Sequence, residues 1–298
     1  MLRLLIRGYC LACAPLLLLS ACSLPSGSAE LEPISPQAVV DPGSTPIFLP
    51  EISRDYQPNT PGAGDWWRPK PGTSWQWQLS GEIDTSVAAQ MYDIDLFDAP
   101  QSVIDQIHAS GRKVICYFSA GSREDWRPDA ASFPETALGN ELEGWPGERW
   151  LDIRLLDALA PIMASRLDLA QQKGCDGVEP DNVDGYTNET GFPLTPQDQL
   201  TYNRWLAEQA HARRLSVGLK NDLEQIPDLL PYFDWALNEQ CFEYQECNSL
   251  LPFVQAGKAV FGVEYDLEPD AFCPQANEMN FDWLKKNLEL DAFRLPCR

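Results

Sequence analysis

The sequence predicts a single α/β domain in which eight strands and their helices close into a (β/α)8 barrel. Three observations support this fold. Eight short apolar runs follow one another along residues 66–298, amphipathic helical patterns separate several of them, and acidic residues stand at the ends of at least four runs. Alternation of helices with fully apolar strands is typical of a parallel sheet, and eight strands favour closure over an open sheet.

The predicted strands are bounded by polar or turn-forming residues, as expected for strands that are buried on both faces. In chain order they are 75–79, 91–97, 114–119, 177–182, 216–221, 235–240, 259–265 and 292–297. Helices are predicted where apolar residues recur every three or four positions, at 101–110, 155–173, 196–214 and 281–288. A long insertion, 121–152, follows the third strand, on the side where the loops of such barrels build active sites.

The first 21 residues have the features of a secretory leader. Arg3 and Arg7 precede an apolar stretch that is too short to span a membrane comfortably. The stretch ends in Leu19-Ser20-Ala21-Cys22, which resembles a bacterial lipobox, whose cysteine becomes the lipidated first residue of the mature chain. We therefore expect a lipid on Cys22; the alternative is an ordinary cleaved leader followed by a chance cysteine.

Residues 22–65 are rich in Pro, Ser and Gly, and are predicted to form an extended tether between the lipid and one domain at 66–298. Ser23 follows the cysteine, at a position where Asp would favour retention in the inner membrane. The expected location is the cell envelope, with the anchor in the outer membrane.

Six of the nine cysteines remain after the leader is removed and Cys22 is lipidated. An even number of cysteines in an oxidising compartment suggests disulfides, and none of the six forms a CxxC pair. The pairing does not follow from the sequence. Cys241 and Cys247 form the easiest local loop, and Cys273 with Cys297 would then hold the C-terminus.

Charge and composition exclude several functions. The formal net charge is −22, and removal of the two leader arginines makes the mature chain more negative, so no nucleic-acid partner is expected. His108 and His211 are the only histidines, and both lie in helical patterns, which leaves little material for a catalytic triad or a histidine metal site. No nucleotide-binding motif is present. The stretch 181–185 fails the ligand alternation of a calcium loop, so no metal or cofactor is expected.

Acidic residues recur where the predicted strands end. A single acid there is usually a helix cap, but the ends of a closed parallel barrel meet at one mouth, so recurrent acids are expected to converge. Their crowding raises some pKa values, which suits general acid and base catalysis, and glycoside hydrolysis needs two such carboxyls. Aromatic residues near the same ends, such as Tyr117 and Tyr186, offer flat faces for sugar rings. The acids are Asp93, Asp95, Glu179, Asp181, Asp222, Glu239, Glu264 and Asp266.

Six ordered motifs then suggest a family. They are Trp-Gln-Trp-Gln-Leu (75–79), Tyr-Asp-Ile-Asp-Leu-Phe-Asp (92–98), Cys-Tyr-Phe-Ser-Ala-Gly-Ser (116–122), Gly-Cys-Asp-Gly-Val-Glu-Pro-Asp-Asn-Val-Asp-Gly-Tyr (174–186), Leu-Asn-Glu-Gln-Cys (237–241) and Phe-Gly-Val-Glu-Tyr (261–265). Together they resemble glycoside hydrolase family 114, a family of TIM-barrel proteins whose known activity is endo-α-1,4-polygalactosaminidase. The resemblance covers nearly all of residues 66–298.

The resemblance implies a catalytic pair made of an Asp on the fourth strand and a Glu on the sixth. The matching residues are Asp181 and Glu239. Glu179 stays an alternative to Asp181, because strand alternation places both on the same face. Further residues are expected to bind substrate or to tune the pair: Asp93, Asp95, Tyr117, Lys220, Asn221, Glu264 and Tyr186.

The implied partner is a cationic amino-sugar polysaccharide, which a strongly acidic domain would concentrate at its surface. Two other functions stay open on sequence grounds. One is a carbohydrate-binding envelope lipoprotein on a degenerate barrel without catalysis, and the other is a structural lipoprotein of the envelope. A binding protein needs the aromatic residues but not two carboxyls at catalytic separation.

The lipobox prediction is tested by the substitution Cys22→Ser. The variant lacks the thiol that accepts the lipid, so we expect it in the soluble fraction after cell disruption, whereas the unsubstituted chain fractionates with membranes. Unchanged membrane fractionation of Cys22→Ser would contradict the lipid anchor.

Overall fold

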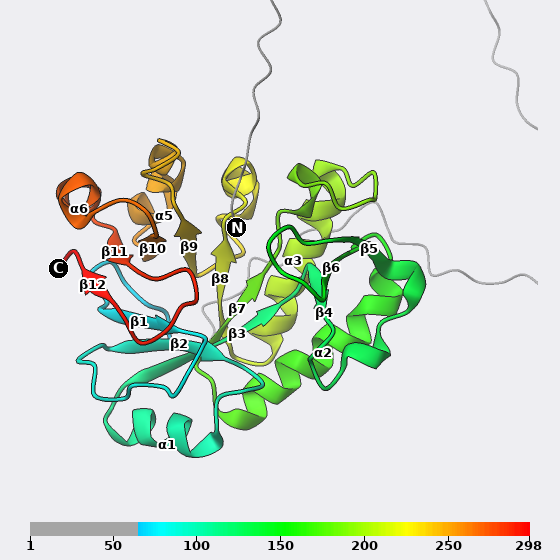
Figure 1. Ribbon diagram of the computed structural model, residues 1–298, viewed down its shortest axis with the longest axis horizontal. Coiled ribbons are helices and arrows are strands. Elements are labelled where there is room, and N and C mark those ends of the chain that lie inside the picture. Colours follow the sequence, from blue (N-terminus) through cyan, green and yellow to red (C-terminus); the bar gives the residue numbers. More distant parts are fainter. Residues whose placement is uncertain (1–64) are drawn as a thin grey trace, which may run out of the picture. The chain divides into compact units, whose positions relative to one another are not determined.

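The computed structural model describes residues 65–298 (Figure 1). The predicted leader, Cys22 and all but the last residue of the predicted tether lie outside these residues. Within residues 65–298, no helix has both the length and the apolar character needed to cross a membrane.

Eight parallel strands form the central sheet and confirm the predicted barrel architecture. Neighbours in the sheet are also neighbours among these strands along the chain: β1 (Trp75–Gln78), β2 (Met91–Asp95), β3 (Lys113–Ser119), β7 (Gly177–Asp181), β8 (Ser216–Lys220), β9 (Trp235–Glu239), β10 (Val260–Glu264) and β11 (Asp282–Lys285). A short antiparallel strand, β12 (Leu295–Pro296), pairs with the outer edge of β11.

The junction between β11 and β1 is closed without a strand ladder among the described residues. Instead, the indole Nε1 of Trp75 donates to the carbonyl of Asp282 at 2.8 Å, and the backbone N–H of Leu79 donates to the carbonyl of Leu290 at 2.9 Å. The sheet therefore curls into a barrel whose final connection uses a side chain and a loop.

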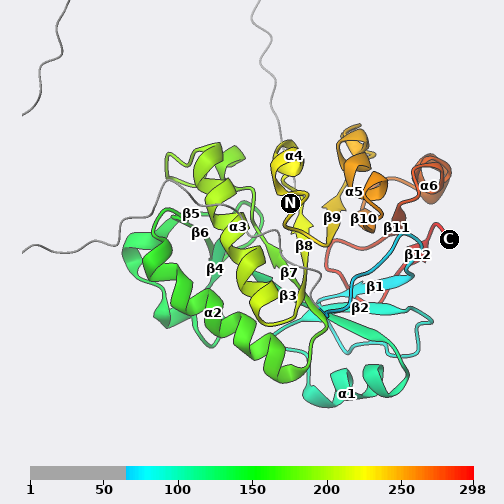
Figure 2. The same cartoon turned by 180° about the vertical axis from the view of Figure 1, so that it is seen from behind.

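Within residues 65–298, six α-helices lie along the outside of the sheet (Figure 1, Figure 2). They are α1 (Gln101–Ala109), α2 (Leu156–Lys173), α3 (Pro196–Ala212), α4 (Ile226–Leu229), α5 (Leu251–Gln255) and α6 (Pro269–Glu278). Thr195 and Asp198 form a reciprocal capping box that starts α3, and Gly174, in the left-handed region, ends α2. Single 3-10 turns occur at Ala130–Ser132, Glu135–Ala137, Gly185–Thr187, Leu223–Gln225 and Cys247–Leu250.

The insertion after β3 folds into a small antiparallel sheet of its own. Its strands are β4 (Ser122–Glu124), β5 (Leu138–Glu141) and β6 (Glu148–Leu151), with β6 in the middle. In both views this sheet lies on the side of β3 and β7 (Figure 1, Figure 2). Gly121 permits the close approach, because a Cβ there would lie 1.6 Å from the carbonyl oxygen of Asn182.

Apolar side chains fill two separate regions on the two faces of the strands. One region lies inside the barrel and is rich in aromatic residues, including Trp75, Trp77, Trp235 and Phe261. Gly218 makes room for the Trp235 ring, which a Cβ would approach to 2.4 Å. The larger region lies between the strands and the helices. Strand residues that point inward therefore share the barrel interior, and the polar ones among them build the site.

Two predicted elements near the C-terminus are wrong. Residues 281–288, predicted as a helix, contain the eighth parallel strand β11, and residues 292–297, predicted as that strand, contain only the two-residue β12. The apolar positions of this short segment fit a helical or an extended period equally well, so its periodicity could not decide. Helix α6 was not predicted; Pro269 begins it and Pro274 lies inside it.

Three disulfides link the six cysteines of the domain. Cys241–Cys247 and Cys273–Cys297 confirm the two pairs that the spacing favoured. The remaining bond, Cys116–Cys175, joins β3 to the segment before β7 across a sequence separation of 59 residues. Two of the strands that carry site residues are thus tied covalently.

Candidate active site

The C-terminal ends of the barrel strands and the insertion surround one pocket of about 220 Å³. Strand residues at its base include Asp181 from β7, Lys220 from β8 and Glu239 from β9. Its other lining residues are Trp77, Leu79, Ser80, Asp95, Asp98, Tyr117, Glu124, Trp126, Arg127, Trp145, Glu148, Asn182, Tyr265, Leu288, Glu289 and Leu290. The predicted convergence of acids from different strands is therefore present.

The ammonium group of Lys220 lies among three carboxyl groups. Its Nζ is 2.8 Å from Asp181 Oδ1, 3.3 Å from Glu179 Oε1 and 3.3 Å from Glu239 Oε2, and the residue is only 2% exposed. The face of the Trp77 ring lies 4.9 Å from the same nitrogen. Although burial alone lowers the pKa of an ammonium, the carboxylates raise the pKa of Lys220 well above its usual value, so the lysine stays charged.

Asp181 is held by three donors. Besides Lys220, its own neighbour Asn182 donates a backbone N–H to Oδ1 at 2.7 Å, and the phenol of Tyr117 donates to Oδ2 at 3.2 Å. The left-handed backbone conformation of Asn182, with φ of 62°, accompanies this contact between its N–H and Asp181 Oδ1. The two strong contacts fall on Oδ1, which leaves Oδ2 as the less restrained oxygen facing the pocket.

Glu239 is oriented by Tyr265 and Asn221. The Tyr265 hydroxyl donates to Oε1, and the Asn221 amide donates to Oε2 at 3.3 Å. The carbonyl oxygen of the Asn221 side chain in turn accepts the backbone N–H of Glu239 at 3.0 Å. Asn221, also left-handed with φ of 51°, thus fixes both the backbone and the carboxyl at the end of β9.

Asp93 and Glu179 form a second carboxyl pair below the pocket. Both are fully buried, and a charge on Asp93 disfavours a second charge on Glu179. Burial raises the pKa of Asp93 to about 8 and raises the pKa of Glu179 well above its usual value. Neither residue lines the pocket, whereas Asp181 does. The geometry therefore favours Asp181 over Glu179 as the carboxyl that meets a substrate.

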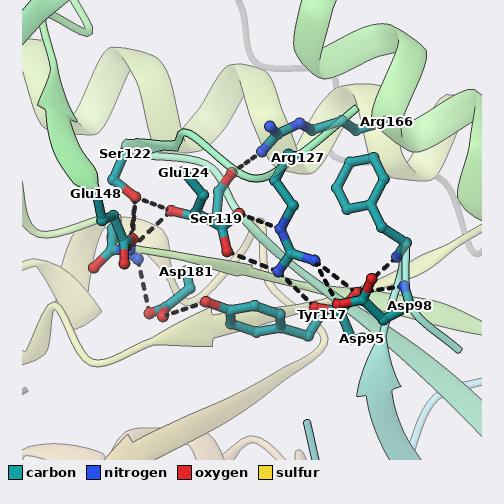
Figure 3. A network of polar contacts seen from close by, with 12 residues as sticks. Asp95, Asp98, Tyr117, Ser119, Ser122, Glu124, Arg127, Glu148, Arg166 and Asp181 are labelled. Carbon is teal, nitrogen blue, oxygen red and sulfur yellow. Dashed lines mark hydrogen bonds and ion pairs between the residues drawn. The ribbon is translucent and has the colours of Figure 1, made fainter. Parts of the chain in front are cut away.

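The remaining pocket acids near β2 are bound by Arg127 (Figure 3). Its guanidinium donates to both oxygens of Asp95 at 3.0 and 2.6 Å, and to both oxygens of Glu124 at 2.8 and 2.7 Å. Asp98 accepts a further bond at 3.2 Å. Asp95, predicted to bind substrate, is thus neutralised within the protein and ties the β2 loop to the insertion.

Glu148, on β6, occupies the other side of this network (Figure 3). Its Oε1 accepts hydrogen bonds from the Ser122 hydroxyl and from the Asn182 amide, the latter at 3.0 Å. Burial, reinforced by the charges of Glu124 and Asp181, raises the pKa of Glu148 to about 7.

Two further predicted site residues lie away from the acid cluster. Glu264 points to the outer layer of the barrel, where it accepts the Phe242 N–H at 3.0 Å and the Trp283 indole N–H at 3.3 Å. Its neighbours Val263 and Tyr265 face the interior, so strand alternation turns Glu264 away from the pocket. Tyr186 donates to Glu224 at 3.3 Å and does not line the pocket. Placing Glu264 and Tyr186 in the site was therefore incorrect.

The insertion supplies pocket residues that were not predicted, namely Glu124, Trp126, Arg127, Trp145 and Glu148. Trp126 and Trp145 are 51% and 40% exposed, so their rings are available to a bound molecule. The sequence does carry a signal for them, because tryptophans and acids concentrate in a long loop after a barrel strand. Within residues 65–298, no group of His, Cys, Asp and Glu could hold a metal ion; at the acid cluster the central cation is Lys220.

Comparisons with known proteins agree with this geometry. Residues 57–298 match the model of glycoside-hydrolase family GH114. The crystal structure of Ega3 from Aspergillus fumigatus in complex with galactosamine is 45% identical in sequence, covers 78% of this chain and 100% of its own, and has a TM-score of 0.74. The glycoside hydrolase domain of PelA from Pseudomonas aeruginosa shares the fold at 13% identity, with 75% and 98% of the two chains covered and a TM-score of 0.60. A comparison with curated proteins gave no match.

The buried carboxyls predict how stability changes with pH. Burial raises the pKa of Asp93 and Asp222 to about 8 and the pKa of Glu148 and Glu264 to about 7. Their pKa values in the unfolded chain are about 4. Between these values the folded chain keeps protons that the unfolded chain releases, so stability is greatest near the unfolded pKa and falls as pH rises towards the folded pKa. We expect the free energy of unfolding to decrease from pH 5 to pH 8.

Denaturant titration at fixed pH steps measures this decrease, and Asp222→Asn is the matched variant. The backbone of Asp222 is in the left-handed region, with φ of 42°, which Asn also tolerates. The side-chain oxygen of an Asn can still accept the hydrogen bond that Asn203 donates to Asp222. The variant should show a smaller loss over the same pH range, by about 1 kcal/mol or more. Stability that is flat or rises between pH 5 and 8 would refute the account.

Proposed function

The chain belongs to glycoside hydrolase family GH114, and we propose that it is an endo-acting enzyme that hydrolyses α-1,4-linked galactosamine-containing polysaccharide with two carboxyl groups. One observation carries the proposal: Asp181 and Glu239 line the same pocket and contact the same ammonium group. The relative crystallised with galactosamine supports an amino sugar as substrate. The acidic pocket and the formal charge of −22 favour a cationic polymer.

The spacing of the pair supports retention of configuration. Nζ of Lys220 lies 2.8 Å from Asp181 Oδ1 and 3.3 Å from Glu239 Oε2, so these oxygens are no farther apart than the sum of the two distances. That sum is below the about 6.5–9.5 Å separation of inverting enzymes, which must fit a water between the carboxyls. Retaining enzymes hold them about 5–5.5 Å apart.

We assign Asp181 as the nucleophile and Glu239 as the acid and base. Asp181 receives three donors, two of them on Oδ1, so its charge is stabilised while Oδ2 attacks the anomeric carbon. Although burial alone would raise it, Lys220 and the hydroxyl of Tyr265 hold the pKa of Glu239 well below its usual value in the free site, so the proposal requires that Glu239 take up a proton when the substrate binds. The glycosidic C–O bond then breaks as Glu239 gives that proton to the leaving oxygen. A water molecule then loses a proton to Glu239 and attacks the same carbon, which releases Asp181.

Lys220 can stabilise the negative charge of either carboxyl during these reaction steps. Formation of the glycosyl ester removes the negative charge of Asp181, and proton donation creates one on Glu239. The charge thus passes between two groups that both contact Nζ, so the buried ammonium keeps an anionic partner throughout.

Two features of the chain suggest how a polymer is held and where. The exposed rings of Trp126 and Trp145 offer flat surfaces to sugars on either side of the cleaved bond. The sequence Leu19-Ser20-Ala21-Cys22 supports attachment to the cell envelope, in the outer membrane, through a lipid on Cys22.

Activity on purified α-1,4-polygalactosamine tests the proposal. The mature chain should release reducing ends and shorten the polymer to intermediate oligomers early in the reaction. Asp181→Asn and Glu239→Gln should each lower kcat by about 10³-fold or more while folding is kept. Asp266→Asn, a matched change at an exposed acid, should remain fully active.

Rescue by azide distinguishes the nucleophile from the acid and base. The substrate for this experiment is an oligosaccharide α-galactosaminide that carries an aryl leaving group, which departs without a proton. Azide should rescue Glu239→Ala with an α-glycosyl azide as product, and rescue Asp181→Gly with the β-anomer. Near-wild-type activity of both Asn and Gln variants would refute the pair. A wild-type chain that binds the polymer without cleaving it would instead support a carbohydrate-binding protein.

A further inference from the structure

Glu148 differs from the other buried acids of the pocket in having no cationic partner. Asp95 and Glu124 are paired with Arg127, and Asp181 and Glu239 with Lys220. Glu148 is 5% exposed, and the partners of its carboxyl within residues 65–298 are Ser122 and Asn182, both of which bond to Oε1. Its Oε2 remains for a ligand in the pocket that Glu148 lines.

A buried carboxylate without a counter-charge is costly, and this cost decreases when a cation enters. The raised pKa of Glu148 is the expected consequence of that burial and of the nearby charges of Glu124 and Asp181. Arg127 acts on Glu148 only from beyond ion-pair distance and is already occupied by three carboxyls. The missing partner is thus expected to come from outside the protein.

The position of Glu148 relative to Asp181 indicates which group of a bound amino sugar it would contact. Asn182 connects it to the proposed nucleophile, because its side chain donates to Glu148 Oε1 at 3.0 Å and its backbone N–H donates to Asp181 Oδ1 at 2.7 Å. A sugar whose C1 meets Asp181 carries its C2 substituent on the adjacent ring carbon, two bonds from C1. In galactosamine that substituent is an ammonium group.

The geometry points to Glu148 as the residue that binds the C2 ammonium of the sugar being cleaved, and so selects deacetylated galactosamine over its N-acetylated form. This inference rests on the proposed function. An acetamido group offers no charge to Glu148 and would leave its carboxyl unpaired.

The same contact assists the reaction. Positive charge develops on C1 and the ring oxygen in the transition state. An ammonium on the adjacent carbon raises the energy of that charge, and a carboxylate beside the ammonium offsets the repulsion. Glu148 should therefore affect kcat on amino substrates, not KM alone.

The test compares Glu148→Gln with Glu143→Gln, an identical substitution at an exposed acid of the same insertion. Each is assayed on fully deacetylated and on N-acetylated α-1,4-polygalactosamine. Glu148→Gln should lower kcat/KM on the deacetylated polymer by about 10²-fold, which corresponds to the loss of a hydrogen bond between charged groups worth up to about 3 kcal/mol. On the acetylated polymer, kcat/KM should change only a few-fold. Glu143→Gln should leave both values unchanged. Equal losses on both polymers, or no loss on either, would overturn the inference.

Binding of monosaccharides to the wild-type chain gives an independent readout that needs no folded variant and no cleavage. Calorimetry should give tighter binding of galactosamine than of galactose, with the preference lost in Glu148→Gln if that variant folds. Equal affinity of the wild-type chain for the two sugars would overturn the role of Glu148. A chain that prefers galactosamine but cleaves neither polymer would refute the proposed function and leave the role of Glu148 standing.

Discussion

Burial of the Lys220 ammonium is possible only because carboxyl groups on two strands surround it at 2.8–3.3 Å. Removing one partner of a buried ion pair costs about 3–5 kcal/mol, so this contact constrains β7, β8 and β9 together. The same contact brings Asp181 and Glu239 within reach of one sugar. Glu179 and Asp93 lie below the pocket, where burial raises the pKa of both and so favours their protonated forms. The charge balance near Lys220 then rests on Asp181 and Glu239, which line the pocket.

The insertion after β3 supplies a second group of side chains to the pocket that contains this cluster. Arg127 attaches it to the β2 loop through Asp95, and Gly121 lets its first residues pass against the backbone at Asn182. Asn182 then links Glu148 on the insertion to Asp181 on the barrel. Barrel and insertion therefore hold their carboxyls in a fixed relation. In the proposed mechanism the barrel carries the reacting carboxyls, and in the further inference the insertion supplies the carboxyl that distinguishes one sugar from another.

The barrel was predictable from periodicity, and the convergence of Asp181 and Glu239 in one pocket was predictable from strand ends and from the family resemblance. Glu264 was wrongly placed in the site because successive side chains of a strand point to opposite faces of the sheet, so a residue at a strand end can point away from the barrel mouth. The strand β11 was taken for a helix because its apolar spacing fits both periods. Glu148 could not be predicted, since its place depends on how β6 pairs with β4 within the insertion, and nothing in a single sequence specifies that register.

The pH dependence of Lys220→Met tests most directly whether the ammonium serves both carboxyls of the proposed catalytic pair. A positive charge beside a carboxyl lowers its pKa, and the acidic limb of kcat/KM reports the group that must be ionised in the free enzyme. In a folded Lys220→Met variant, the remaining activity on α-1,4-polygalactosamine should show this limb displaced to higher pH by about one unit or more, together with a large loss of rate. An acidic limb at the wild-type pH, with a rate close to wild type, would contradict the account.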